Sequence, residues 1–179
     1  MKKIILASAM LVATISVASA NSAPYVGTSL GVNSNTSTHA NGGSGGAYRG
    51  IPLKVFAGYG GIISETFYLA GELTATLGSA EISNKNHMKT SYGYGLSALP
   101  GVMVNDETLA FARVGYVRSR FANVTKMSSG AQLGFGMQTS VTQHVDLRGE
   151  YDFTSYANAG AIKSPRTDEF NLGMVYKFD

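Results

Sequence analysis

The sequence predicts an all-β fold, an eight-stranded antiparallel up-and-down transmembrane β-barrel. From residue 24 onward, apolar and polar residues alternate with a period of two, and helical periodicity is almost absent. Turn-rich gaps divide this pattern into eight segments, and the gaps alternate between long and short. That rhythm is typical of a barrel with tight turns at one end and loops at the other.

Residues 1–20 precede this pattern and have the features of a signal peptide for export. Lys2 and Lys3 begin the segment, Ile4 to Val17 is apolar, and Ala18-Ser19-Ala20 matches a small-residue cleavage site. We therefore expect a cleaved signal peptide at 1–20 and an outer-membrane barrel domain at 21–179. Its removal lowers the net charge from +3 to +1, so no nucleic-acid partner is expected.

The eight expected strands follow from the alternation taken in chain order. In the third strand Phe67, Leu69 and Leu73 lie on one face, whereas Glu72 and Thr74 lie on the other. The expected strands are 24–34, 51–61, 67–77, 90–103, 108–120, 129–140, 145–154 and 167–178. Pro100 falls inside the fourth strand, and because proline lacks an N–H, we expect a bulge or a strand end near it.

The composition favours a membrane barrel over a soluble barrel of the lipocalin type. Charged residues are only 14% of the chain, below the roughly 25% of soluble domains. The charged faces of the strands also carry many glycines, which suit a crowded lumen, whereas the opposite faces carry large apolar residues and no charge. An uncharged exterior of this kind would aggregate in water, so the charged faces are predicted to line the lumen.

Charges that share a closed lumen need partners, because an unpaired charge is costly in a low-dielectric interior. We expect Arg113 and Arg148 to pair with Glu72 and Glu150 and to close the lumen. A narrow ion path through the same residues is the alternative. The predicted lumen charge network is Lys54, Glu72, Arg113, Asp146, Arg148, Glu150 and Asp152, and the alternation also turns Glu169 and Lys177 inward.

Aromatic residues near strand ends are expected to mark the two membrane interfaces. The candidates for these girdles are Tyr25, Tyr59, Phe67, Tyr151, Tyr156, Tyr176 and Phe178.

The residue types in this sequence do not favour catalysis, metal binding or cofactor binding. The chain has no Cys, so thiolate chemistry is excluded. Its three histidines, His39, His87 and His144, fall in predicted loops and a turn, where they are expected to be solvated. We predict a protein that is not an enzyme and has no cofactor. A lipid-modifying enzyme is the alternative, and it requires a base within hydrogen-bond reach of a nucleophile.

Several segments resemble the opacity-protein and OmpA-like family of small outer-membrane barrels. They are the stretch 96–116, from LSALPGV to ARVGY, then LGFGM at 133–137 and LRGEYDF at 147–153. The resemblance implies an integral protein of the outer membrane of a Gram-negative bacterium, with loops used in adhesion, host contact or envelope integrity. Met174 to Phe178 also resembles the C-terminal signal read by the barrel-insertion machinery, although Asp179 follows it.

Charge along the barrel is predicted to be uneven. The long gaps are basic, whereas the short turns carry Glu65, Asp106 and Glu107. If the long gaps face outward, cationic side chains there meet the phosphates of lipopolysaccharide. The expected contacts are Arg118, Arg120, Lys126 and Arg166, and ordinary solvated loop charge is the alternative.

Overall fold

The structure is a computed structural model that describes residues 22–38, 48–84, 90–121, 127–157 and 163–178. Those residues form strands and the turns between them, and none of their segments is a helix long and apolar enough to cross a membrane. The strands are β1 (Ser22–Thr38), β2 (Tyr48–Ser64), β3 (Phe67–Asn84), β4 (Thr90–Asn105), β5 (Thr108–Phe121), β6 (Ser128–Ser140), β7 (Val145–Tyr156) and β8 (Lys163–Lys177).

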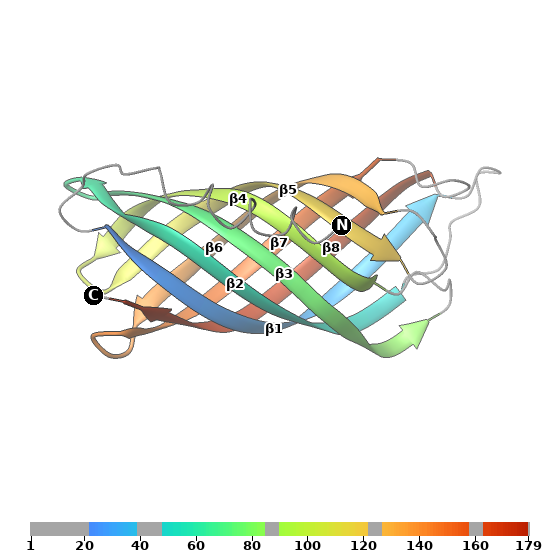
Figure 1. Cartoon of the computed structure of the whole chain (residues 1–179), viewed down its shortest axis with the longest axis horizontal. Helices are drawn as coiled ribbons and strands as arrows, with labels where there is room; N and C mark the ends of the chain where they lie inside the picture. Colours follow the sequence, from blue (N-terminus) through green and yellow to red (C-terminus); the bar gives the residue numbers. More distant parts are fainter. Residues whose placement is uncertain (1–21, 39–47, 85–89, 122–126, 158–162, 179) are drawn as a thin grey trace, which may run out of the picture.

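The eight strands form one closed antiparallel barrel in sequence order, as predicted (Figure 1). Each strand pairs with the next, and β1 pairs with β8 to close the ring, with Val26 opposite Tyr176. Closure gives every strand two neighbours, so the barrel has no unpaired edge to place in hydrocarbon. Figure 1 also shows the strands inclined to the long axis, with the C-terminus at the end where the short turns lie. We call this the short-turn end and the opposite end the loop end.

The strand boundaries agree with the prediction within three residues at the short-turn end, and the largest differences lie at the loop ends of β1, β3 and β8. β1 continues to Thr38 and β3 to Asn84, although the expected strands stop at 34 and 77. The pairing of β1 with β8 likewise extends to Thr38 and Lys163. Backbone pairing continues there after the alternation of apolar and polar side chains has stopped in β1 or shifted in β3, so side-chain periodicity alone marks the end of the strand too early.

At Pro100 itself β4 neither ends nor changes register, and the nearest bulge and the strand end come three to five residues later, between Met103 and Asn105. Leu99 and Pro100 are paired with β3 in an uninterrupted register. The ladder between β4 and β5 omits these two residues and then resumes in the same register, with Ala98 opposite Val114 and Gly101 opposite Phe111. The missing proline donor is therefore accommodated on one side of the strand only.

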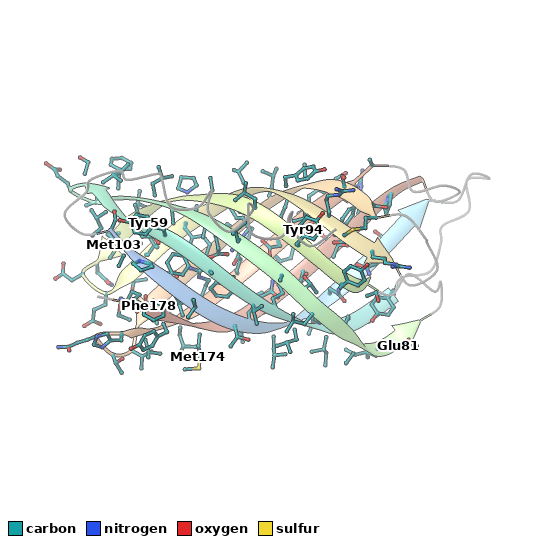
Figure 2. The ribbon with its side chains drawn as sticks, in the orientation of Figure 1. Tyr59, Glu81, Tyr94, Met103, Met174 and Phe178 are labelled. Carbon is teal, nitrogen blue, oxygen red and sulfur yellow. The ribbon has the colours of Figure 1, made fainter. Side chains whose placement is uncertain are left out.

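The outward face is an apolar band. On β8, Phe170, Leu172, Met174 and Tyr176 point outward and are 46–57% exposed. Figure 2 shows Met174 projecting from the barrel wall, with Phe178 near the short-turn end and Glu81 at the loop end. The nine residues from Phe170 to Phe178 span about 27 Å along the chain, which at a tilt of about 40° corresponds to roughly 21 Å of height, close to the apolar band of about 25 Å in outer-membrane barrels.

Glycines on the inward face leave room for large side chains in the lumen. A Cβ on Gly136 would lie 2.7 Å from the ring of Phe111, and a Cβ on Gly58 would overlap the ring of Tyr25. These rings belong to a buried apolar cluster nearer the short-turn end of the lumen. Its buried members are Tyr25, Phe56, Ala70, Leu99, Leu109, Phe111 and Val175.

Candidate functional site

The structure places every residue of the predicted lumen charge network inside the barrel. Their exposed fractions lie between 1% and 8%. Glu169 is buried beside them, and Lys177 is half-buried near the mouth of the lumen at the short-turn end. Four of these nine side chains are cationic and five are acidic, so their charges nearly balance within one closed space.

Glu72 is the centre of this network. Its Oε1 accepts a hydrogen bond from Arg113 Nη2 at 2.6 Å, and its Oε2 accepts one from Arg148 Nη1 at 2.5 Å. The Tyr25 hydroxyl donates to the same Oε2 at 3.0 Å. Arg113 also contacts Glu150 through both Nε and Nη2. The two arginines and two glutamates singled out from the sequence therefore meet, although Arg148 uses Glu72 and Arg113 uses both acids.

Toward the loop end, a lysine continues the network across the lumen. Lys54 on β2 lies 2.7 Å from Glu169 on β8 and 3.4 Å from Asp152 on β7. Asn171 Nδ2 donates to Asp152 at 3.3 Å. One ammonium thus pairs with two neighbouring carboxylates, and it links β2 to β7 and β8 across the lumen.

Toward the short-turn end, a chain of hydrogen bonds leads from the centre to the mouth. Arg148 Nε donates to Gln138 Oε1 at 2.8 Å, and Gln138 Nε2 donates to Asp146 at 2.6 Å. Asp146 then pairs with Lys177 at 2.9 Å. The alternation had not singled out Gln138, yet it shares the inward face with the glycines of β6, and that parity is the signal that identifies it.

Three aromatic rings surround the Arg148 guanidinium. Its Cζ lies 4.8 Å from the ring centroid of Phe56, 5.2 Å from that of Phe111 and 5.5 Å from that of Tyr25. At these distances a cation is attracted to the faces of the rings, most strongly where water is excluded. We call Tyr25, Phe56 and Phe111 the aromatic cage.

Little free space remains in the lumen. One cavity of about 20 Å³ lies among Glu72, Arg148 and Asp152, and another of about 40 Å³ lies nearer the loop end, among Asn33, Thr167 and Glu169. Spaces of this size hold one to a few water molecules. Lys54 borders both cavities, so its ion pairs stand between them.

Buried acceptors without a hydrogen-bond partner gather around these cavities. Within the part of the chain that the structure describes, Asn33 Oδ1 and Asn171 Oδ1 have none, and both residues are at least 95% buried. The aromatic cage holds no comparable polar atom, since the Tyr25 hydroxyl is bonded to Glu72. The loop-end half of the lumen is thus the less completely satisfied half.

The outward arginines form a second candidate site at the loop end. Arg118 and Arg120 face outward on β5, opposite Tyr94 and Tyr92 of β4. Arg120 Nη1 donates to the Tyr92 hydroxyl at 3.2 Å and lies over its ring, whereas Arg118 Nε has no partner among the described residues. Arg166 is exposed on β8, three strands away from β5, and Lys126 lies outside the described residues.

The aromatic girdle prediction is wrong for two of its seven residues, and the other five are exposed, as a girdle requires. Tyr59, Phe67, Tyr151, Tyr176 and Phe178 are exposed on the outer wall or at its end. By contrast, two of the predicted girdle residues, Tyr25 and Tyr156, are buried in the lumen, where the Tyr156 hydroxyl lies 3.1 Å from Ser119 Oγ. Period-two parity places both residues with the inward glycines and serines, and proximity to a strand end is the weaker signal.

Histidine and metal chemistry gain no support from the described residues. His144 lies in the turn between β6 and β7 and stacks on Tyr176, with ring centroids 6.0 Å apart. No group of three or more His, Asp or Glu side chains in the described part of the chain is arranged to hold a metal ion. His39 and His87 lie outside that part.

Solved structures share this architecture. The crystal structure of Neisserial surface protein A (NspA) superposes with a TM-score of 0.55 at 18% identity, covering 87% of this chain and 97% of that one. Ail, the attachment invasion locus protein of Yersinia pestis, gives 0.49 at 15% identity and covers 87% and 99%. OprG from Pseudomonas aeruginosa gives 0.46 at 10% identity and covers 88% and 97%.

A sequence comparison identifies the family of this chain. No functionally curated protein matches the chain. Residues 4–178, nearly the whole sequence, match the family described as outer membrane protein beta-barrel domain. The resemblance inferred from the strand motifs is therefore confirmed at the level of the family, and this chain belongs to the outer-membrane β-barrel family.

Proposed function

We propose that this protein is a sealed, non-catalytic barrel of the Gram-negative outer membrane. In this role the barrel is an anchor, the arginines at the loop end contact lipopolysaccharide, and the loops contact a surface outside the cell or support the envelope. The signal peptide at 1–20 and the C-terminal strand, read by the barrel-insertion machinery, bring it there.

The filled lumen is the observation that carries this proposal. Five ion pairs and hydrogen bonds centred on Glu72 cross the barrel, and the aromatic cage lies beside them. The two cavities described above among the strand residues have room for only a few waters. A lumen filled in this way favours an anchoring role over transport, because spaces of this size are too small for a hydrated ion.

The second part of the proposal concerns lipid contact through Arg118, Arg120, Lys126 and Arg166. An arginine binds phosphate bidentately, and charge-assisted hydrogen bonds of this kind are about twice as strong as neutral ones. Arg118 supports the proposal because its Nε is shielded by the barrel wall yet has no acceptor among the described residues. A phosphate oxygen would supply that acceptor.

Membrane fractionation combined with heat-modifiable migration on SDS gels tests the barrel part. We expect the protein in the outer-membrane fraction and an unboiled band that migrates faster than the boiled one. Recovery in the soluble periplasmic fraction with no shift would contradict the proposal, and would mean that the apolar face encloses a ligand instead.

Substitution of all four lipid-contacting residues by glutamine tests the second part. We expect the variant to copurify with less lipopolysaccharide and to unfold at a lower temperature in the native membrane. The control is Glu107→Gln, a change in an exposed short turn at the other end of the barrel. Unchanged lipid content and unchanged stability in the fourfold variant would remove lipopolysaccharide from the proposal.

A further inference from the structure

The closure between β1 and β8 brings together two arginines that are far apart in the sequence. Arg49 on β2 is paired with Ser34 of β1, and Arg166 on β8 is paired with Thr36 of β1. The two arginines therefore lie on either side of β1, at positions two residues apart along it. They are neighbours only because the pairing of β1 with β8 closes the ring.

All four of these side chains face away from the lumen. The residues on either side of Arg49 are buried inside the barrel, and so are those on either side of Arg166. Both arginines are exposed, and Ser34 and Thr36 are partly exposed between them. We call Ser34, Thr36, Arg49 and Arg166 the seam site.

The spacing suits one shared ligand. Adjacent strands lie about 4.8 Å apart and each residue advances about 3.4 Å, so the Cα atoms of Arg49 and Arg166 are roughly 12 Å apart across β1. Two extended arginine side chains can meet over the middle strand at this distance. The hydroxyls of Ser34 and Thr36 lie below the meeting point and offer two further donors.

Charge at the seam favours an anion. Among the described residues, neither arginine has an ion-pair partner. Asp168 is the outward acid next to Arg166 along β8, and its Oδ1 already accepts a hydrogen bond from the Tyr151 hydroxyl at 2.8 Å. Asp168 is paired with Ser34, and Glu81 on β3 is exposed opposite Gly50, next to Arg49. Each of these two carboxylates has an interaction with another residue, so within the described residues neither guanidinium is held in an ion pair.

The apolar wall begins directly below the seam site. Val32 on β1 and Phe170 on β8 are outward neighbours toward the short-turn end, and they are 54% and 50% exposed. Ile51 on β2 is 40% exposed at the corresponding position. An amphiphile with its phosphate on the arginines would therefore lay its acyl chains on apolar side chains.

We propose that the seam site binds a phosphate group carried by an outer-leaflet lipid. The inference rests on the proposed function, which places the loop end in the outer leaflet, and it adds a site on the opposite wall from Arg118 and Arg120. Each guanidinium donates two parallel hydrogen bonds to phosphate oxygens, and the two hydroxyls donate to the remaining ones.

The test removes the β5 site first, so that the seam site is measured alone. The background variant is the full barrel carrying Arg118→Gln, Arg120→Gln and Lys126→Gln, reconstituted in phosphatidylcholine nanodiscs. The probe is bisphosphorylated lipid A with a fluorescent label. We expect the background variant to retain binding, and Arg49→Gln with Arg166→Gln in addition to weaken it by about tenfold or more for each arginine, the size of a charge-assisted hydrogen bond.

Two further variants separate recognition from folding. Arg49→Lys with Arg166→Lys keeps the charge but loses the bidentate geometry, so binding is expected to fall between the background and the glutamine variant. Asp168→Asn removes the nearby carboxylate yet leaves an oxygen to accept from Tyr151, and is expected to tighten binding several-fold. All variants must show the heat-modifiable migration of the wild type.

The outcomes distinguish this inference from the proposed function. If wild type binds lipid A and the background variant does not, the β5 contact stands and the seam site is wrong. If the added glutamines leave binding unchanged, the seam site is also wrong. If wild type does not bind at all, both are wrong. Displacement of lipid A by an equal concentration of inorganic pyrophosphate would show that the ligand is a free phosphate, and would overturn the lipid as its source.

Discussion

The two halves of the lumen are built in different ways, although the same eight strands line both. Toward the short-turn end, Arg148 lies among the rings of the aromatic cage, and glycines such as Gly58 and Gly136 admit those rings. Toward the loop end, neutral polar residues dominate, the larger cavity is found, and Asn33 Oδ1 lacks a partner among the described residues.

This difference shows where packing specifies the structure. In the short-turn half the side chains are closely packed against one another, so a change in size or charge is expected to lower the free energy of unfolding. In the loop-end half, small water-sized spaces allow side chains to adjust. We therefore expect substitutions at the centre and in the short-turn half to cost far more than substitutions near the loop end.

The largest effect is expected at Glu72, the centre of the network. Glu72→Gln removes the charge that faces both Arg113 and Arg148, and breaking a buried pair in this way costs about 3–5 kcal/mol. The free energy of unfolding in denaturant, measured in lipid vesicles, checks this. Glu107→Gln, in an exposed turn, is the control and is expected to change nothing. A loss below about 1 kcal/mol for Glu72→Gln would mean that the network does not stabilise the barrel.

A smaller loss is expected for Arg148→Leu. Glu72 keeps Arg113 as a partner, and leucine is compatible with the apolar cage, so the cost falls to about 2–3 kcal/mol. The unfolding temperature should drop while the conductance in a planar bilayer stays at the baseline. A large new conductance would contradict the proposal that the lumen is sealed, and would mean that Arg148 is needed to close it.

Glycine substitutions test packing in the short-turn half directly. A Cβ on Gly58 would overlap Tyr25, so Gly58→Ala is expected to destabilise by about 1–3 kcal/mol through overpacking. Gly71 lies on the outward face of the adjoining strand, and a Cβ there meets nothing within 4 Å. Gly71→Ala is therefore the matched control. Equal unfolding free energies for the two variants would show that Tyr25 moves freely.

The smallest effect is expected in the loop-end half. Asn33→Leu replaces a buried side chain whose Oδ1 has no hydrogen-bond partner among the described residues by an apolar group of similar size, so the unfolding free energy should change by less than about 1 kcal/mol in either direction. Denaturant titration of this variant and of Gly58→Ala under the same conditions compares their unfolding free energies. A loss as large as that of Glu72→Gln would mean that Asn33 has an essential polar contact.

The sequence predicts the parts of this fold that depend on side-chain parity. Alternation gives the eight strands, their short-turn boundaries and the inward direction of residues such as Arg113 and Asp152. It fails at the loop end of β1, where the residues are polar while the backbone pairing continues. It also fails at the loop end of β3, where a register shift at Leu77 moves the outward positions to Ala80 and Ile82. Pro100 lacks a backbone N–H, yet β4 continues through it because the residue remains paired with β3. Only the ladder with β5 is interrupted there.

Contacts across the barrel were harder to anticipate, because they depend on closure and on the stagger between strands. The pairing of Lys54 with Glu169, and the approach of Arg49 to Arg166 around β1, both need the joining of the first and last strands. Tyr25 could have been placed correctly, since it shares the inward parity of Gly27 and Ser29. Its position near a strand end suggested a girdle instead.

The sealed lumen is tested most directly by the current through the purified wild-type barrel in a planar lipid bilayer. The account predicts a baseline current without discrete opening steps, because the Glu72 network and the aromatic cage fill the cross-section. Regular unitary steps that persist at high salt, from barrels shown to be folded by their heat-modifiable migration, would contradict it and would favour a narrow channel.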